Sequence, residues 1–272
     1  MAPSLTSKAL QATGVLTFFS LASFTVWTKH SRFSTPAEFN PATDPLFQSE
    51  WVRKFNPANH AATYDECVRR IGLQKIRPEL VEDAQRGGSK LVEEFVRGVW
   101  GGPGYTLQRL YLQLKYRNDT TTAHQLWTPA QLQSSDYGPD TQITDHFVVL
   151  RKTPTSVLIR CGDSPLNNPD SPRQSDGLFE MCARVDPAEG FAEFRLKSIF
   201  FVGDQSWTGE KAVDDPQQGE RKQIEGTSSS VGAADTAVQK WENRGPMQGT
   251  MWFAHKLYTK LWMESALSRV KM

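Results

Sequence analysis

The chain has 272 residues, of which 38% are hydrophobic and 22% are charged, and its formal net charge is +1. This length suits one large domain or one domain with extensions, and the hydrophobic fraction supports an ordinary core. A protein that binds nucleic acid by neutralising phosphates needs a basic surface, which argues against that class here. We therefore expect no nucleic acid among the partners.

The sequence contains none of the common catalytic or metal-binding motifs. Cys67, Cys161 and Cys182 occur at no metal-binding spacing, and their odd number argues against a disulfide framework. The glycines of residues 101–104 lack the Lys-Ser/Thr ending of a phosphate-binding loop. No nucleophile elbow and no His-Glu-x-x-His sequence occurs either. We predict buried free thiols, no metal and no cofactor, and find little support for a hydrolase or a zinc enzyme.

The first 33 residues predict a membrane anchor or a targeting segment. They contain no acidic side chain, and residues 9–27 carry no charge at all. As a helix this run would rise about 28 Å, close to the hydrocarbon thickness of a bilayer. Lys8 precedes the run, and Lys29, His30 and Arg32 follow it. A single-pass anchor of this kind would place the protein at the endoplasmic reticulum or the mitochondrion.

Two alternatives to the anchor remain open. The segment is rich in Ser and Thr, weakly basic and free of acid, which is also typical of a cleaved organelle-targeting peptide. A secretory signal fits less well because the start is not strongly basic and no clean cleavage pattern follows. The positive charges after the run favour a C-terminal domain on the cytosolic side.

Residues 34–63 are interpreted as a linker that lies on the domain surface. Asn-Pro and Asp-Pro turn dipeptides recur in it, and phenylalanines and a tryptophan punctuate it. Residues 64–76 then predict a first strand. Residues 78–100 predict one helix, or two if Gly87 and Gly88 break it, and residues 106–116 fit either a helix or a strand.

The second half of the chain predicts a meander followed by a long helix. Alternating apolar residues between 142 and 204, with a turn at 186–190, indicate antiparallel strands with one buried face. Residues 205–245 are polar and read as a flexible insertion. Residues 246–270 predict a helix that is apolar on two sides, because Trp252, Leu257 and Trp262 widen its apolar face. Such a helix needs a broad partner, and the meander is the candidate.

This order of elements resembles the helix-grip fold of START-like lipid-transfer domains and polyketide cyclase-like proteins. The similar pieces are residues 144–150 (TDHFVVL), 175–180 (SDGLFE) and 255–258 (HKLY), and the likeness is to members of the kind found in fungi. The resemblance implies an α+β domain over residues 64–272, with a curved antiparallel sheet packed on the C-terminal helix. It also implies an apolar cavity between sheet and helix. The N-terminal hydrophobic helix and the insertion depart from the compact bacterial forms.

Three groups of residues are candidates for the site. Asp145 and His146 are adjacent, and in a strand they would point to opposite faces and could not form a dyad. Either His146 faces inward as an acid or base, or Asp145 does and needs a partner, or the pair is an ordinary surface histidine and a hydrogen-bonded aspartate. Arg160 could pair with Asp176 and Glu180 across strands, as a structural ion pair or as a polar patch that orients a ligand carbonyl.

His255 and Tyr258 form the third group, because they lie one helical turn apart. Tyr258 falls on the apolar face, so its hydroxyl needs a partner inside the protein. The pair could move a proton in an enolisation, dehydration or cyclisation, or it could be a core tyrosine beside a peripheral histidine.

The sequence leaves several functions open. The first is a protein that binds or transfers a hydrophobic small molecule such as a lipid, sterol or quinone. The second is a biosynthetic enzyme of the cyclase, isomerase or dehydratase type that acts on a polyketide or terpenoid-like substrate. The third is a structural membrane-associated factor with a collapsed cavity.

Overall fold

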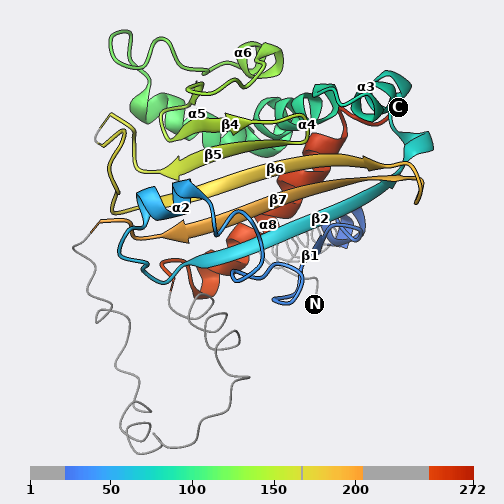
Figure 1. Ribbon diagram of the computed structural model, residues 1–272. Helices are drawn as coiled ribbons and strands as arrows, with labels where there is room; N and C mark the ends of the chain where they lie inside the picture. Colours follow the sequence, from blue (N-terminus) through green and yellow to red (C-terminus); the bar gives the residue numbers. More distant parts are fainter. Residues whose placement is uncertain (1–21, 167, 205–244) are drawn as a thin grey trace, which may run out of the picture.

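The computed structural model describes residues 22–166, 168–204 and 245–272 (Figure 1). They form an α+β arrangement in which seven antiparallel strands pair in the order β1-β2-β7-β6-β5-β4-β3. The strands are β1 (Arg32–Phe33), β2 (Thr63–Gly72), β3 (Gln142–Ile143), β4 (Phe147–Lys152), β5 (Ser156–Gly162), β6 (Asp176–Asp186) and β7 (Phe191–Phe201). The helices are α2 (Glu50–Phe55), α3 (Pro78–Gln85), α4 (Lys90–Gly101), α5 (Thr106–Tyr116), α6 (Pro129–Ser134) and α8 (Gly249–Leu267), with short 3-10 turns at Leu73–Lys75 and Pro103–Tyr105.

The helices α4 and α8 cover one face of the sheet, called here the inner face (Figure 1). Alternation along β6 sends Phe179 and Met181 to this face and Leu178 to the other. The two helices approach closely at Gly98, where an added Cβ would lie 2.4 Å from the carbonyl oxygen of Ala266. The absence of a side chain at Gly98 therefore lets α8 pack directly on α4.

Residues 34–62, within the segment interpreted as a linker that lies on the domain surface, cover the opposite, outer face. Phe39, Phe47, Val52 and Phe55 are buried in a second apolar cluster with outer-face residues of the sheet. Burial of each such side chain is favourable by roughly 1.5–3 kcal/mol. The ordered unit also begins before residue 64, because β1 pairs with β2.

The long C-terminal helix and the meander are confirmed, and the ambiguous segments resolve as follows. Residues 78–100 form two helices because Gly87 adopts a φ of +83° between them. Residues 106–116 are the helix α5. The strand predicted at residues 64–76 is β2, which spans Thr63–Gly72 and is preceded by the short β1.

The predicted anchor and insertion fall largely outside the described residues. Residues 22–27 are helical, and Val26 and Trp27 there are 64% and 45% exposed. In the part of the chain that the structure describes, no helix combines the length and apolarity needed to cross a membrane. The anchor therefore stays a prediction, as does the character of residues 205–244.

Candidate functional site: a cavity between the sheet and α8

A cavity of about 490 Å³ lies between α8 and the inner face of the sheet. Its wall is mainly aromatic and sulfur-containing, since the strands contribute phenylalanines, α8 contributes Met251 and Trp262, and Met247 lies just before α8. The apolar lining residues are Phe147, Cys161, Phe179, Phe200, Phe201, Pro246, Met247, Met251 and Trp262. The volume falls in the range of small-molecule sites, which are typically lined by such side chains and a few polar groups.

Tyr258 supplies one of the polar groups in this wall. Its hydroxyl donates a hydrogen bond of 2.9 Å to Oε1 of Gln108 on α5, and both residues line the cavity. The partner expected for this hydroxyl is therefore Gln108. Burial raises the pKa of Tyr258 to about 12, so its phenol is neutral at physiological pH. The Tyr258–Gln108 pair can offer hydrogen bonds to a ligand without presenting a charge.

His255 is the second polar group, and its ring is fixed from several sides. Its Nε2 lies 3.2 Å from Oδ1 of Asp65 on β2 and 3.3 Å from Oγ1 of Thr259. The ring stacks on Trp252 at 5.1 Å, and Phe200 meets it edge-on. The carboxylate of Asp65 therefore orients the ring of His255, which lines the cavity. This contact also fixes which ring nitrogen of His255 carries the proton.

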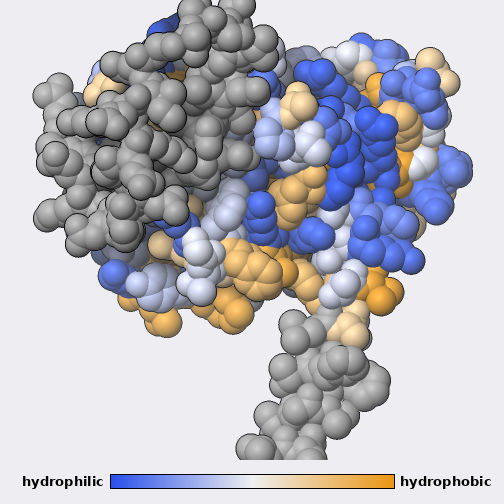
Figure 2. Space-filling view, turned by 90° about the horizontal axis from the view of Figure 1, so that it is seen from below, coloured by the Kyte–Doolittle hydropathy of each residue, from blue (hydrophilic) through white to orange (hydrophobic). Residues whose placement is uncertain are grey.

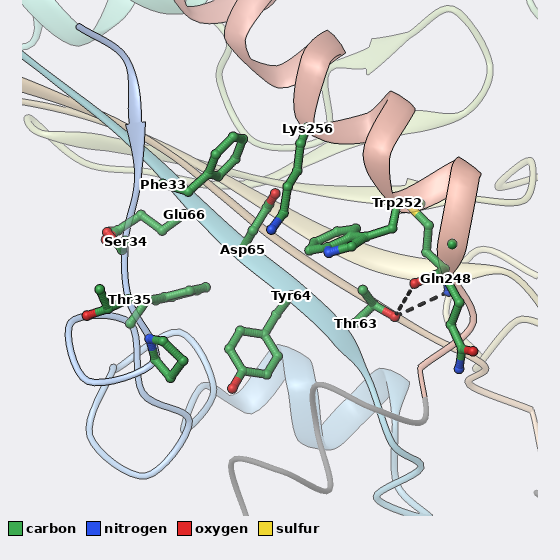
Figure 3. Close-up of a pocket in the computed structure, with 14 residues that line it drawn as sticks. Phe33, Ser34, Thr35, Thr63, Tyr64, Asp65, Glu66, Gln248, Trp252 and Lys256 are labelled. Carbon is green, nitrogen blue, oxygen red and sulfur yellow. Dashed lines mark hydrogen bonds between the residues drawn. The ribbon is translucent and has the colours of Figure 1, made fainter. Parts of the chain in front are cut away.

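Asp65 also lines a second pocket, of about 400 Å³, on the other side of α8 (Figure 3). Figure 3 shows Asp65, Lys256 and Trp252 pointing toward one another across the gap between β2 and α8. The side chain of Asp65 is 5% exposed, and its Oδ2 is buried with no hydrogen-bond partner among the described residues. The Asp65–His255 contact thus joins the wall of this polar pocket to that of the apolar cavity.

Asp145 and His146 form a pair, contrary to the sequence prediction. Residues 144–146 are a turn before β4, and Thr144 and Asp145 have positive φ angles of 44° and 70°. Because this backbone is not extended, the two side chains meet, with Nδ1 of His146 3.1 Å from Oδ2 of Asp145. Asp145 also accepts a hydrogen bond of 2.9 Å from Ser164.

His146 lies in the cavity wall together with Tyr258 and His255. Its ring packs against that of Tyr116 at 4.5 Å. The three residues proposed as catalytic candidates therefore share one cavity, although they come from a turn and from two positions on α8.

Arg160 and Glu180 do not reach this cavity. Arg160 points to the outer face, where it forms a bidentate ion pair with Asp176 at 2.9 and 2.6 Å and covers the ring of Phe55. Glu180 pairs with Lys197 and Arg151 instead of Arg160. Asp176 touches the cavity wall, but both of its carboxylate oxygens accept bonds from Arg160. The structure therefore favours the structural ion pair over a ligand-orienting patch.

The buried thiols are inert in this setting. Cys67, Cys161 and Cys182 are free and buried, and burial raises the pKa of each thiol. Among the described residues no group of three or more His, Cys, Asp or Glu side chains is arranged to hold a metal ion.

Asp65 is the site residue that sequence reasoning missed. It stands in a strand of mixed composition, DECVRR, where nothing in the local pattern distinguishes it from a surface carboxylate. Its role depends on its contact with His255, which lies 190 residues further along the sequence. Comparison with protein-family models, with curated proteins and with solved structures finds no match to this chain.

Proposed function

We propose that the protein binds a largely apolar, uncharged small molecule in the cavity between the sheet and α8, in the manner of a helix-grip lipid-, sterol- or quinone-binding protein. The observation that carries this proposal is the cavity of about 490 Å³ with its aromatic and methionine lining. Burying ligand surface against that lining is favourable by roughly 25 cal/mol per Å². A structural factor with a collapsed cavity would have filled this space with its own side chains.

The polar groups in the wall indicate what the ligand carries. Gln108, Tyr258, His146 and His255 can exchange hydrogen bonds with a carbonyl or a hydroxyl. Among the described residues of the wall, the acidic side chain of Asp176 is already paired with Arg160. A ligand with an apolar body and one or two oxygen atoms therefore fits better than a cation.

Binding is tested by titrating the full chain with Nile red, an uncharged apolar fluorophore. We expect saturable binding with one site per chain and a blue-shifted emission, because the dye would leave water for an aromatic wall. An unlabelled sterol or quinone should displace the bound Nile red. Emission that rises without saturation, or no displacement by any apolar competitor, would argue against a defined cavity site.

A second candidate function is an enzyme that moves a proton, and the Asp65–His255 contact favours it. Nε2 of His255 is engaged by Asp65 and Thr259, while Nδ1 has no hydrogen-bond partner among the described residues. That nitrogen could accept a proton from carbon next to a ligand carbonyl. The C–H electron pair would form the carbon–carbon double bond of the enolate, and the carbonyl π pair would move onto oxygen. Tyr258 would turn its hydroxyl from Gln108 to donate a hydrogen bond to that oxygen, and the proton would return to carbon from His255.

The enzyme hypothesis makes a distinct prediction for apolar cyclic ketones in D₂O. We expect the protein to catalyse deuterium incorporation next to the carbonyl, measured by mass spectrometry. His255→Gln should slow this by a factor of about 10²–10⁴, since it removes the general base. Asp65→Asn should slow it less, while Asp170→Asn, at an exposed site outside the cavity lining, should leave it unchanged. If deuterium exchange proceeds at the uncatalysed rate, the enzyme hypothesis is wrong and ligand binding stays the proposed function.

A further inference from the structure

The helix α5 exposes an apolar stripe to solvent. Leu107, Leu110, Tyr111 and Leu114 recur at three- and four-residue steps and are 82%, 43%, 57% and 90% exposed. In a soluble domain such a stripe is normally buried against the core. The core side of this helix is instead formed by Leu112, with Gln108 turned toward α8. The described residues therefore leave most of the apolar stripe uncovered.

The helix α8 carries a second exposed apolar face. Its inner side packs on the sheet, with Met251 in the cavity wall, yet Phe253 and Leu257 on its far side are 65% and 37% exposed. The sequence predicts that α8 is apolar on two sides. In the structure the sheet covers one of these sides and leaves the other exposed. Viewed from below, where α8 begins, apolar side chains gather on the described surface (Figure 2).

The helices α5 and α8 meet at the cavity. Gln108 of α5 and Tyr258 of α8 are joined by their hydrogen bond of 2.9 Å, and each is a chain neighbour of an exposed leucine, Leu107 and Leu257. We call the exposed residues of α5 and α8 together the apolar surface. Large exposed apolar surfaces on soluble proteins mark sites of interaction with proteins or membranes.

The charges beside the apolar surface are one-sided. The two helices contain four basic residues, Arg109, Lys115, Lys256 and Lys260, and one acidic residue, Glu264. Glu264 is buried and already pairs with Arg69. In the described part of the chain none of the four basic side chains lies within 4 Å of a carboxylate. Lys256 points toward the carboxylate of Asp65 (Figure 3), so the cations without a carboxylate partner among the described residues beside the apolar surface are Arg109, Lys115 and Lys260.

We propose that this apolar surface docks on an anionic lipid bilayer, with the exposed leucines, Phe253 and Tyr111 entering the headgroup region. Exposed apolar and aromatic side chains flanked by Lys and Arg are the combination that interfacial helices use. Lys115 lies over the rings of Tyr111 and Tyr116, which suits an aromatic and cationic boundary at the interface. This docking does not depend on the identity of the cavity ligand.

A second copy of the chain is a poorer occupant of the apolar surface. A twofold interface would place the same patch of each copy against the other. These cations would then face their own copies, with no exposed carboxylate on either helix to compensate them. A membrane with anionic headgroups removes this repulsion.

The test uses the full chain labelled with NBD at one added cysteine. Leu114→Cys and Phe253→Cys place the label on the apolar surface, and Ala188→Cys, on the exposed β6–β7 turn, is the matched control. The three native cysteines are buried and do not compete for the label. With phosphatidylcholine–phosphatidylserine vesicles, we expect NBD emission to rise at residues 114 and 253 and to stay constant at 188.

The charge requirement is tested with Lys115→Gln, with the label at residue 253. One basic side chain near an anionic surface contributes about fivefold in affinity, so binding to phosphatidylserine vesicles should weaken about fivefold. Lys54→Gln, on the outer face, should have no effect. Vesicle-bound protein with unchanged emission at residues 114 and 253 would overturn the proposal, because the N-terminal segment alone would then hold it there. Absence of vesicle binding, or emission that rises with protein concentration without vesicles, would also overturn it.

Discussion

Replacing Asp176 with alanine is expected to lower the free energy of unfolding by about 3–5 kcal/mol, because it leaves the guanidinium of Arg160 charged and buried without its partner. The side chains of Arg160 and Asp176 are 1% and 0% exposed. Arg160 also donates to the carbonyl oxygens of Pro169 and Ser171, and Asp176 accepts from the backbone of Arg173. The pair therefore ties the loop before β6 to the outer face of the sheet. Urea denaturation measures the effect.

An exposed ion pair is the control for this experiment. Lys54 and Asp170 lie 3.1 Å apart, but their side chains are 43% and 84% exposed. Asp170→Ala should therefore change the free energy of unfolding by about 0–1 kcal/mol. Equal effects of the two substitutions would show that Arg160 and Asp176 are not the buried pair described.

Cys161→Phe is expected to weaken binding of an apolar ligand by at least about tenfold, or about 1.4 kcal/mol. Cys161 lies in the cavity wall on β5, so a larger ring at this position would occupy ligand space. Since the ring would enter a void, we expect the free energy of unfolding to change by less than about 1 kcal/mol. Nile red titration and urea denaturation of the same preparation measure both quantities.

Cys67→Phe is the matched control, because Cys67 is also fully buried but lies outside the cavity lining. At position 67 a phenyl ring must displace packed neighbours, so the free energy of unfolding should fall by about 1–3 kcal/mol. If Cys161→Phe destabilises as much as Cys67→Phe and leaves dye binding unchanged, the space beside Cys161 is not a binding cavity.

Periodic features of this chain could be predicted from the sequence, because local geometry decides them. The alternation along β6 and β7 and the long apolar run of α8 follow from side-chain directions in strands and helices. The inside partner of Tyr258 was expected on the same basis, since a buried hydroxyl needs one.

Features that depend on one irregular residue or on distant parts of the chain could not be predicted. Asp145 and His146 meet because Thr144 and Asp145 adopt positive φ, which alternation cannot anticipate. The segment at 34–62 has the turn dipeptides of a linker, yet its aromatics fill the outer cluster. Asp65 contacts His255 only because β2 and α8 are brought together by the fold.

The central claim, an apolar cavity that holds a small molecule, is tested most directly by native mass spectrometry of the full chain purified from its own host, followed by organic extraction. We predict one apolar molecule per chain in the wild type and its loss in the Cys161→Phe variant. A wild-type chain that carries no adduct under conditions that preserve its fold, and that takes up none of the sterols or quinones offered, would contradict the account.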